Sequence, residues 1–491
     1  MRYFFVFCLS LYVISCNPTT EKTQQKNLPN ILFLFADDFT YDAIRALGND
    51  IIHTPNLDRL VKNGTHFNQA FNMGGWNGAV CIASRSMIIT GKSIWRAKAL
   101  SDQWKKSEMH ELAQESWGKL MEQQGYQTYM TGKWHVSIAP EKIFQTVRNV
   151  RPGMPKDFFR KGNQKGYHRP KIGETDVWNP TDSLNGGFWE GGKHWSEVAK
   201  DDAIDFIEKS REKASPFFMY IAFNAPHDPR QSPQKYLDLY PLKDIPLPKN
   251  WLPEYPYKDA IGNSKTLRDE ALGPYPRTPY AIKTHMREYY AIITHLDEQI
   301  GKIIRGLEAS GKADNTYIFF TGDHGLSVGK HGLLGKQNLF DHSIRVPLIV
   351  SGPDIPRNKC IIHPVYYQDI MASSLELAEI PKPKSVAFKS FLSLIKGNEA
   401  SSPYPEGIYG AYMDSQRMIR KDEYKLVIYP KIKKILLFDL KNDPLEQYDI
   451  SNEFQYKNTV KNLFQSLILL QQKYNDSLDL NYIFNSQKFH I

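Results

Sequence analysis

At 491 residues, the chain is too long for one ordinary hydrophobic core, and its length predicts one large domain and a smaller one. Its 41% hydrophobic and 23% charged residues are typical of a water-soluble globular protein. The net charge of +9 is not gathered in one long basic block. This excludes nucleic acid as the expected partner and favours a basic cleft for an anionic substrate.

The first 28 residues predict export and a membrane tether. After Arg2 comes an apolar run, residues 3–14, that is too short to span a bilayer as a stable helix. The run ends in Val-Ile-Ser before Cys16. This pattern resembles a bacterial lipobox, in which the cysteine is lipidated and becomes the first mature residue. We expect a lipoprotein signal peptide over 1–15 and a lipidated flexible tether over 16–28.

The alternative is an ordinary signal peptide with an incidental cysteine. No later segment is long and apolar enough to cross a bilayer. The sequence therefore predicts an exported bacterial lipoprotein, periplasmic or anchored at the outer membrane or cell surface. It would touch the membrane through its lipid only, with its bulk in water.

Strand-like and helix-like stretches alternate from residue 29 onward. The apolar run 31–36 suits a central parallel strand buried on both faces. Periodicity and terminal glycines predict helices over 54–64 and 108–124, and a strand over 126–131 follows. Region 137–195 lacks periodicity and is predicted as loops.

The second half of this region continues the alternation. The expected elements are a helix from a Ser196 cap to about 212, a strand over 216–223, a proline-rich loop region over 228–279, a long helix over 282–307 and strands over 317–320 and 345–351. The pattern predicts an α/β domain over 29–380, with a large, mostly parallel sheet flanked by helices.

The character of the chain changes near residue 381. Short antiparallel strands are expected over 407–412, 424–429 and 435–440, and an amphipathic helix over 454–474. We therefore predict a smaller C-terminal α+β subdomain over 381–491, which carries an antiparallel sheet.

Two pairs of polar residues follow the carboxyl ends of predicted strands, where open α/β sheets bind ligands. Asp37 and Asp38 end the first strand, and Asp323 and His324 follow the strand at 317–320. Adjacent carboxylates repel each other unless a cation or hydrogen-bond donors hold them charged, and such oxygen ligands suit calcium or magnesium. Taken alone, each pair fits a helix cap or a turn equally well.

Further polar motifs lie in similar positions. Gly-Lys-Trp-His contains Lys133 and His135, Ala-Pro-His ends in His227, and Lys336 lies in a glycine-containing loop. Singly, such residues are usually solvated or belong to rigid turns.

The stretch from Cys81 to Gly91 is the most unusual in the chain. Cys81 is followed by Arg85 four positions later and by Thr-Gly at the end of a helix-length stretch. Alone, this pattern commonly means a buried thiol beside a helix with one surface arginine. Cys8 would leave with the signal peptide and Cys16 would carry lipid, so Cys81 and Cys360 could form the single disulfide of an exported chain.

Together, these motifs resemble the signature of the sulfatase family, which is related in fold to the alkaline phosphatases. The resemblance rests on Cys81-x-Ala83-x-Arg85 with Thr-Gly, and it covers roughly residues 29 to 450 with each motif in the expected order. Arg345-Val-Pro completes the set. An alkaline-phosphatase-like fold and the hydrolysis of sulfate esters are the resulting expectations.

The resemblance implies that a maturation enzyme oxidises Cys81 to formylglycine, an aldehyde that hydrates to a geminal diol. It also implies one divalent metal, calcium rather than magnesium, bound to the formylglycine oxygen and the four polar residues at the strand ends. Ala83 replaces the commoner proline, and His324 stands where many relatives carry asparagine. A nitrogen ligand is less usual for calcium, so the identity of the metal is the less specific part of the expectation.

The same resemblance suggests roles for the charged groups. A metal-bound diol supplies a nucleophilic oxygen of lowered pKa. Arg85, Lys133 and Lys336 would neutralise the sulfuryl oxygens, helped by the N-terminus of a helix expected from Ser84.

Under this interpretation, two histidines transfer the protons. His227, with Lys336 as a candidate helper, would protonate the departing alcohol. His135 would take the second proton of the diol, after which sulfate is eliminated and the aldehyde is regenerated.

Two other functions fit much of the pattern. The first is a phosphoesterase or phosphonate hydrolase of the same superfamily. The second is a non-catalytic glycan-binding lipoprotein on a degenerate sulfatase fold, although the retention of every charged site residue argues against it.

A lipid-anchored, exported sulfatase resembles those of bacteria that degrade sulfated polysaccharides, so a sulfated glycan or its oligosaccharides is the expected substrate. Arginines and tryptophans in the loop regions could form a basic, aromatic-lined subsite, or simply pack and face solvent. These residues are Arg148, Arg151, Arg160, Arg169, Trp178, Trp189 and Trp195.

Overall fold

The computed structural model describes Met1 and residues 28–106, 113–151, 153, 166–184, 192–398 and 401–486. Apart from Met1 and Leu28, the predicted signal peptide and tether lie outside this part of the chain, as do Cys16, Arg160 and Trp189. No described helix is both long enough and apolar enough to cross a membrane.

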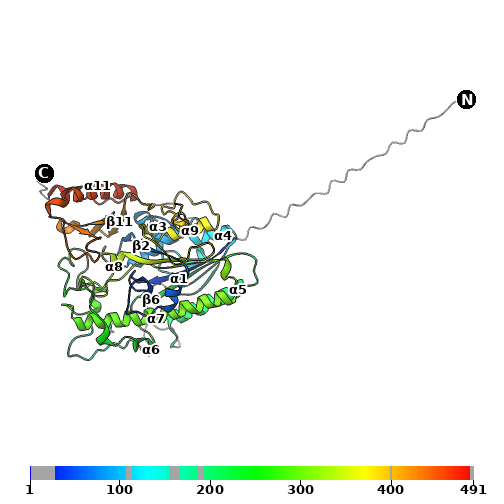
Figure 1. The fold of residues 1–491 in the computed structure, drawn as a ribbon, viewed down its shortest axis with the longest axis horizontal. Coiled ribbons are helices and arrows are strands. Elements are labelled where there is room, and N and C mark those ends of the chain that lie inside the picture. The colour runs from blue at the N-terminus through cyan, green and yellow to red at the C-terminus, as the bar shows by residue number, and fades with distance from the viewer. Residues whose placement is uncertain are drawn as a thin grey trace.

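A nine-stranded sheet forms the centre of the molecule (Figure 1). Its strands are β1 (Asn30–Asp37), β2 (Thr65–Phe71), β4 (Gln127–Lys133), β5 (Thr146–Arg151), β6 (Phe217–Pro226), β7 (Thr316–Gly322), β8 (Arg345–Ser351), β9 (Lys359–Ile361) and β10 (Val365–Tyr366). Their order is β10-β2-β8-β7-β1-β6-β4-β5, with β9 paired to β2. Only the pairings of β8 with β2 and β7 are antiparallel among the described strands, which confirms the predicted mostly parallel sheet.

Helices cover both faces of this sheet. Figure 1 shows α5 and α7 below it and α3, α4 and α9 above it. The helices are α1 (Pro55–Asn63), α2 (Val80–Thr90), α3 (Ile94–Lys106), α4 (Trp117–Gln123), α5 (Trp195–Ser210), α6 (Gln234–Leu237), α7 (Pro279–Ala309), α8 (Asp341–Ile344), α9 (Asp369–Leu377) and α10 (Leu392–Lys396). Because strand side chains alternate, Leu32 and Leu34 pack into the cluster with α1, α5 and α7, whereas Phe33 and Phe35 face α4 and α9.

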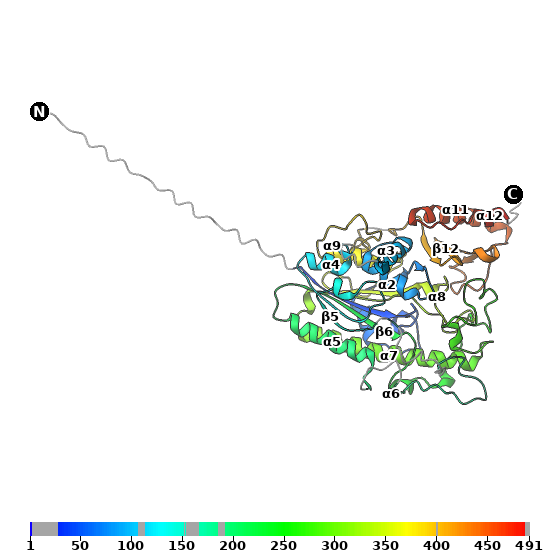
Figure 2. The ribbon, with the colours of Figure 1, turned by 180° about the vertical axis from the view of Figure 1, so that it is seen from behind.

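A second sheet lies beside the first and carries α11 (Lys457–Tyr474) on its outer side (Figure 2). Its antiparallel strands are β11 (Ile408–Tyr412), β12 (Gln416–Lys421), β13 (Tyr424–Tyr429) and β14 (Lys434–Asp439), and the chain ends its described part with α12 (Asn481–Ser486). The fifth strand, β3 (Gly74–Gly75), comes from just before Cys81 and pairs parallel with β11. A Cβ on Gly74 would lie 2.0 Å from the carbonyl oxygen of Ala411, so this close pairing requires glycine.

Several predicted boundaries are wrong. Helix α2 begins at Val80, not Ser84, and α4 is much shorter than the expected helix over 108–124. The cap of α5 is His194, whose ring accepts a hydrogen bond from the backbone N–H of Ser196. The predicted loop region 137–195 contains the edge strand β5.

The suggested disulfide is also wrong. Cys81 and Cys360 are both free thiols in the structure. Cys81 is buried in the first turn of α2, whereas Cys360 is exposed on β9.

Candidate active site

Nine of the predicted site residues meet in one buried cluster at the carboxyl ends of the parallel strands. Asp37 ends β1, Lys133 ends β4, and Asp323 directly follows β7. The cluster consists of Asp37, Asp38, Cys81, Arg85, Lys133, His227, Asp323, His324 and Lys336, all of which are buried. The sheet topology explains why residues from distant parts of the sequence converge, since parallel strands end at one edge.

Cys81 is surrounded by cationic groups. Its Sγ lies 3.4 Å from His324 Nε2, 3.5 Å from Lys336 Nζ and 3.7 Å from Lys133 Nζ. Burial and the charge of Asp37 act to raise the pKa of this thiol, but the three cationic side chains outweigh them and lower it to about 7. An oxygen nucleophile at position 81 would experience the same field.

The acidic residues and His324 fit a divalent cation. Ligand atoms of Asp37, Asp38, Cys81 and His324 all lie within 4.8 Å of one another. His324 Nδ1 donates to the carbonyl oxygen of Gly325 at 2.9 Å, which leaves Nε2 facing the carboxylates, 3.3 Å from Asp38 Oδ1.

Two carboxylate oxygens in this cluster, Asp37 Oδ1 and Asp38 Oδ2, are buried without a hydrogen-bond partner among the described residues. Burial and the nearby charge of Asp37 raise the pKa of Asp323 to about 8. A cation between these groups would compensate the crowded negative charge, so the donor set fits a metal with a preference for oxygen.

Arg85 contacts the cluster through its guanidinium group. Its Nη1 donates to the carbonyl oxygen of Lys133 at 2.8 Å, and its Nε donates to Asp323 at 3.1 Å. The guanidinium also lies over the ring of Phe35, 4.7 Å from the centroid. Arg85 therefore holds β4 and Asp323 in place from a fully buried position.

Lys133 and Lys336 approach the carboxylate pair from two sides. Lys133 forms an ion pair with Asp37, and Lys336 Nζ lies 2.7 Å from Asp38 Oδ1. His227 is near the other oxygen of Asp38, with 3.9 Å between Nε2 and Oδ2. Burial and the charges of both lysines hold the pKa of His227 well below its usual range.

Asp38 has a left-handed backbone conformation, with φ of 65°. The hydroxyl of Tyr289, on α7, donates to the carbonyl oxygen of Asp38 at 2.6 Å and accepts from the N–H of Thr40 at 3.0 Å. The N–H of Asp38 donates to Asp323 Oδ1 at 3.2 Å. These contacts hold an unfavourable backbone conformation that aims the Asp38 carboxylate at the cluster.

His135 differs from the other predicted residues. It also has a left-handed backbone, with φ of 54°, and among the described residues no hydrogen bond or ion pair links it to Cys81. Burial and the charge of Lys133 lower its pKa to about 3, so the imidazole is neutral. Its predicted role as a base stays a prediction.

The described members of the expected basic, aromatic subsite are engaged within the protein. Arg169 is buried and forms ion pairs with Asp176 and Glu288, and Arg148 forms one with Asp205. The guanidinium of Arg151 lies 4.8 Å from the ring centroid of Trp195, and Trp178 is buried. Ordinary packing accounts for these side chains.

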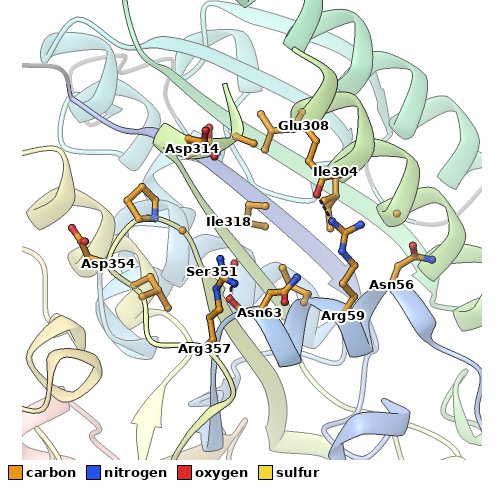
Figure 3. Close-up of a pocket in the computed structure, with 18 residues that line it drawn as sticks. Asn56, Arg59, Asn63, Ile304, Glu308, Asp314, Ile318, Ser351, Asp354 and Arg357 are labelled. Atoms are coloured by element: carbon orange, nitrogen blue, oxygen red, sulfur yellow. Dashed lines mark hydrogen bonds and ion pairs between the residues drawn. The ribbon is translucent and has the colours of Figure 1, made fainter. Parts of the chain in front are cut away.

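One hollow of about 500 Å³ lies away from the cluster, at the opposite end of β7 (Figure 3). Thr316, at the start of that strand, is among its lining residues, whereas Asp323 follows the strand's far end. Arg59 and Glu308 form an ion pair on its wall, and none of the predicted site residues lines it. This hollow is therefore separate from the chemistry.

Residues 29–380 match the family model described as Sulfatase, and residues 329–473 match one described as N-sulphoglucosamine sulphohydrolase, C-terminal. The chain belongs to the sulfatase family. It is a sulfuric ester hydrolase, as the sequence motifs predicted.

Similar proteins span nearly the whole chain. A Bacteroides thetaiotaomicron protein named N-acetylglucosamine-6-O-sulfatase is 26% identical, over 95% of this chain and 90% of that one. A solved complex of a protein with its substrate D-glucosamine-2-N,6-O-disulfate has a TM-score of 0.71 at 24% identity, covering 92% of this chain and 99% of the other. A phosphonate monoester hydrolase from Silicibacter pomeroyi also has a TM-score of 0.71, at 19% identity, covering 92% and 96%. The two structural likenesses show the fold.

Proposed function

We propose that this sulfatase acts on a sulfated glycan or its oligosaccharides through a formylglycine made from Cys81. The observation that supports the proposal is the set of nitrogen groups around Sγ of Cys81: the ammonium groups of Lys133 and Lys336, and Nε2 of His324, which is neutral when it binds a metal. Formylglycine is general to the family, and once hydrated it places two hydroxyls at position 81. A maturation enzyme that uses an external oxidant would supply the oxidation, because none of the side chains in the cluster is an oxidant.

Asp37, Asp38, Asp323 and His324 would hold the metal, together with residue 81. We propose calcium because three of these four side chains are carboxylates, the ligands that calcium prefers, and their oxygens are crowded and partly unpaired. When bound, the metal neutralises charge and lowers the pKa of the nucleophilic hydroxyl.

The chain's own cations would bind the sulfuryl group. Lys133 and Lys336 point at position 81 from two sides, and residue 81 lies in the first turn of α2, where backbone N–H groups favour an anion. These charges would be most effective here because the site is buried and little water screens them.

His227 is the proposed proton donor to the departing alcohol. Its Nδ1 donates to the carbonyl oxygen of Asp228 at 2.6 Å, so Nε2 is the nitrogen that faces the site. A bound sulfate monoester adds negative charge there and would raise the lowered pKa of His227, favouring protonation of Nε2. Lys336 lies on the opposite side of Asp38 and would assist, whereas His135 is proposed only as a neutral acceptor for the second diol proton.

The glycan assignment draws on the relatives. One is named for N-acetylglucosamine 6-sulfate esters, and a structural neighbour was solved with a disulfated glucosamine. We also propose the exported lipoprotein location with lipidation at Cys16. Loss of radiolabelled palmitate from a Cys16→Ala variant would support it, and unchanged labelling would contradict it.

A direct test combines mass spectrometry with substrate comparison. After co-expression with a formylglycine-generating enzyme, the peptide containing residue 81 should show the mass of the aldehyde or its hydrate. The matured protein should hydrolyse sulfated oligosaccharides far faster than aryl phosphates or phosphonate monoesters. An unmodified thiol in an active protein would contradict the formylglycine proposal, and a phosphate or phosphonate preference would favour the first alternative function.

A further inference from the structure

A three-residue segment, Arg268-Asp269-Glu270, contacts the chain on both sides of the active site. It lies in the proline-rich region between α6 and α7, where the sequence predicted only loops. All three side chains are charged, yet Asp269 and Glu270 are buried and the Arg268 side chain is only 27% exposed. Buried charges require specific partners, so their contacts are informative.

The first residue of the segment reaches the His227 side. Arg268 forms ion pairs with Asp228 and with its own neighbour Asp269. Asp228 in turn accepts the hydrogen bond from His227 Nδ1 through its carbonyl oxygen, and its Oδ1 lies 3.4 Å from the same nitrogen. Arg268 therefore fixes the residue that orients the His227 ring.

The other two residues reach the Lys336 side. Glu270 accepts the backbone N–H of Gly335 at 2.9 Å and that of Leu334 at 3.1 Å. Asp269 accepts from Gln337 Nε2 at 2.7 Å, and Gln337 Oε1 accepts the N–H of Lys336 at 3.0 Å. These hydrogen bonds therefore hold the chain immediately before and after Lys336.

The packing at Gly335 leaves no room for a side chain at this position. A Cβ at Gly335 would lie 2.4 Å from Gln337 Oε1 and 2.9 Å from the Cβ of Asp269. The segment itself is anchored by the fully buried ion pair of Glu270 with Arg277, next to the start of α7.

We propose that Arg268 and Asp269, with Glu270 as the anchor, set the positions of His227 and Lys336 relative to each other and to the departing alcohol. The inference rests on the proton-donor roles proposed above. His227 Nε2 and Lys336 Nζ lie on the two oxygens of Asp38, so a shift of either loop would change how both reach the leaving oxygen. The three segment residues are positioning residues, because they act through Asp228, Gly335 and Gln337.

A positioning role can be distinguished from a general effect on the stability of the loop by its dependence on the leaving group. Proton donation matters more when the departing oxygen is more basic. A misplaced donor should therefore slow a sulfate ester with a basic leaving group more than one with a weakly basic leaving group. A variant that merely lowers the fraction of folded enzyme would slow both equally.

The test measures kcat/KM for a phenyl sulfate series, from 4-nitrophenyl to 4-methoxyphenyl sulfate, in Arg268→Met and Asp269→Asn. For the 4-methoxyphenyl ester we expect a loss of about tenfold or more, and for the 4-nitrophenyl ester a loss below about threefold. Lys265→Gln is the matched control. It removes a charge from the same loop at a side chain that is 54% exposed. The slope of log(kcat/KM) against the pKa of the leaving group should therefore equal that of the wild type.

Formylglycine content, bound metal and thermal unfolding are measured for each variant to keep folding defects apart from positioning. Equal losses across the series, or a changed slope in the Lys265 control, would overturn the positioning role while leaving the proposed function intact. A matured wild-type enzyme that cleaves no sulfate ester would overturn the proposed function, and this inference with it.

Discussion

Residue 81 is the point on which the buried charges converge. Lys133, Lys336 and His324 all approach its Sγ, and the thiol is 1% exposed. This arrangement supports the proposed nucleophile at this position and an anion in front of it.

Replacing Cys81 with alanine should remove turnover without unfolding the protein. The substitution takes away the source of the nucleophile, so kcat for an aryl sulfate should fall by roughly 10³-fold or more. The thermal midpoint should stay close to that of the wild type, because a small side chain is replaced by a similar one. Activity above about one per cent of wild type in a purified variant would contradict the assignment of the nucleophile.

Tyr289 should matter for metal binding although it is not itself a ligand. Its hydroxyl holds the left-handed backbone of Asp38, so Tyr289→Phe removes both of the Tyr289 hydrogen bonds that fix this proposed metal ligand. We expect calcium affinity, measured by titration calorimetry, to fall by about 10- to 100-fold.

Tyr290→Phe is the control for this prediction. Tyr290 is the next residue on α7 and its hydroxyl interacts with Asn49, away from the metal ligands. An equal loss of affinity in both variants would show that the Tyr289 hydroxyl has no special role.

At the scale of elements, one helix caps another. Asp297, on α7, accepts the backbone N–H of Leu57 at 2.7 Å and that of Asn56 at 3.1 Å, in the first turn of α1. The local sequence could not reveal this cap, because it comes from a residue some 240 positions away.

Asp297→Ala should therefore destabilise the fold by about 1–2 kcal/mol, since it leaves two helix N–H groups without their acceptor. Urea unfolding measures the change. Lys302→Ala, at an exposed position on the same helix, should stay within about 0.5 kcal/mol of the wild type. If Asp297→Ala lowered the free energy of unfolding by less than about 0.5 kcal/mol, water would satisfy these N–H groups equally well.

The elements that could be predicted from sequence are those buried on both faces. β1 and β6 are continuous apolar runs because helices cover both sides of the sheet centre, and Asp37 stands out where such a run stops. β5 was missed because this edge strand is only half-buried and carries polar residues such as Arg148 and Asn149.

The residues of the site can be divided in the same way into those that the sequence could reveal and those that it could not. Cys81, Lys133 and Asp323 belong to motifs that are recognisable in the sequence. Glu270 and Gln337 belong to no motif and act through backbone contacts between distant loops, so no local signal pointed to them. The family resemblance indicated the charged groups that meet around Cys81, whereas the contacts that hold them could be found only from the structure.

For the whole molecule, the two sheets are joined by a buried charge network. Lys425, on β13, lies 2.9 Å from Asp341 Oδ1 and 2.6 Å from Glu446 Oε1, and Arg420 lies 2.7 Å from Asp341 Oδ2. Asp341 begins α8, five residues after Lys336. The network therefore connects the second sheet to the loop that carries Lys336.

Lys425→Met should be strongly destabilising, by about 3–5 kcal/mol, because it leaves the buried Glu446 without its cation and removes one of the cations that hold Asp341. Denaturant unfolding measures the loss. Lys431→Met, which removes an exposed ion pair with Asp414 from the same sheet, should change stability by less than about 1 kcal/mol. Similar values for the two variants would mean that burial of the network adds nothing.

Removal of the proposed metal should also weaken the whole fold. Without a metal ion, the crowded, buried carboxylates of Asp37, Asp38 and Asp323 are compensated only by the cationic side chains of Lys133, Lys336 and Arg85. Treatment with EDTA should lower both the thermal midpoint and activity, and calcium should restore them better than magnesium. Full activity and an unchanged midpoint in metal-free protein would contradict a metal requirement.

The burial of Cys81 has a consequence for the proposed maturation. Its thiol is 1% exposed and is enclosed by Lys133, Lys336 and His324, so little of this residue is accessible to another enzyme once the chain has folded. Under the proposed function, oxidation would therefore compete with folding, and a molecule that folded first would keep its thiol and stay inactive. The yield of active enzyme would then depend on timing during synthesis as much as on the stability of the finished fold.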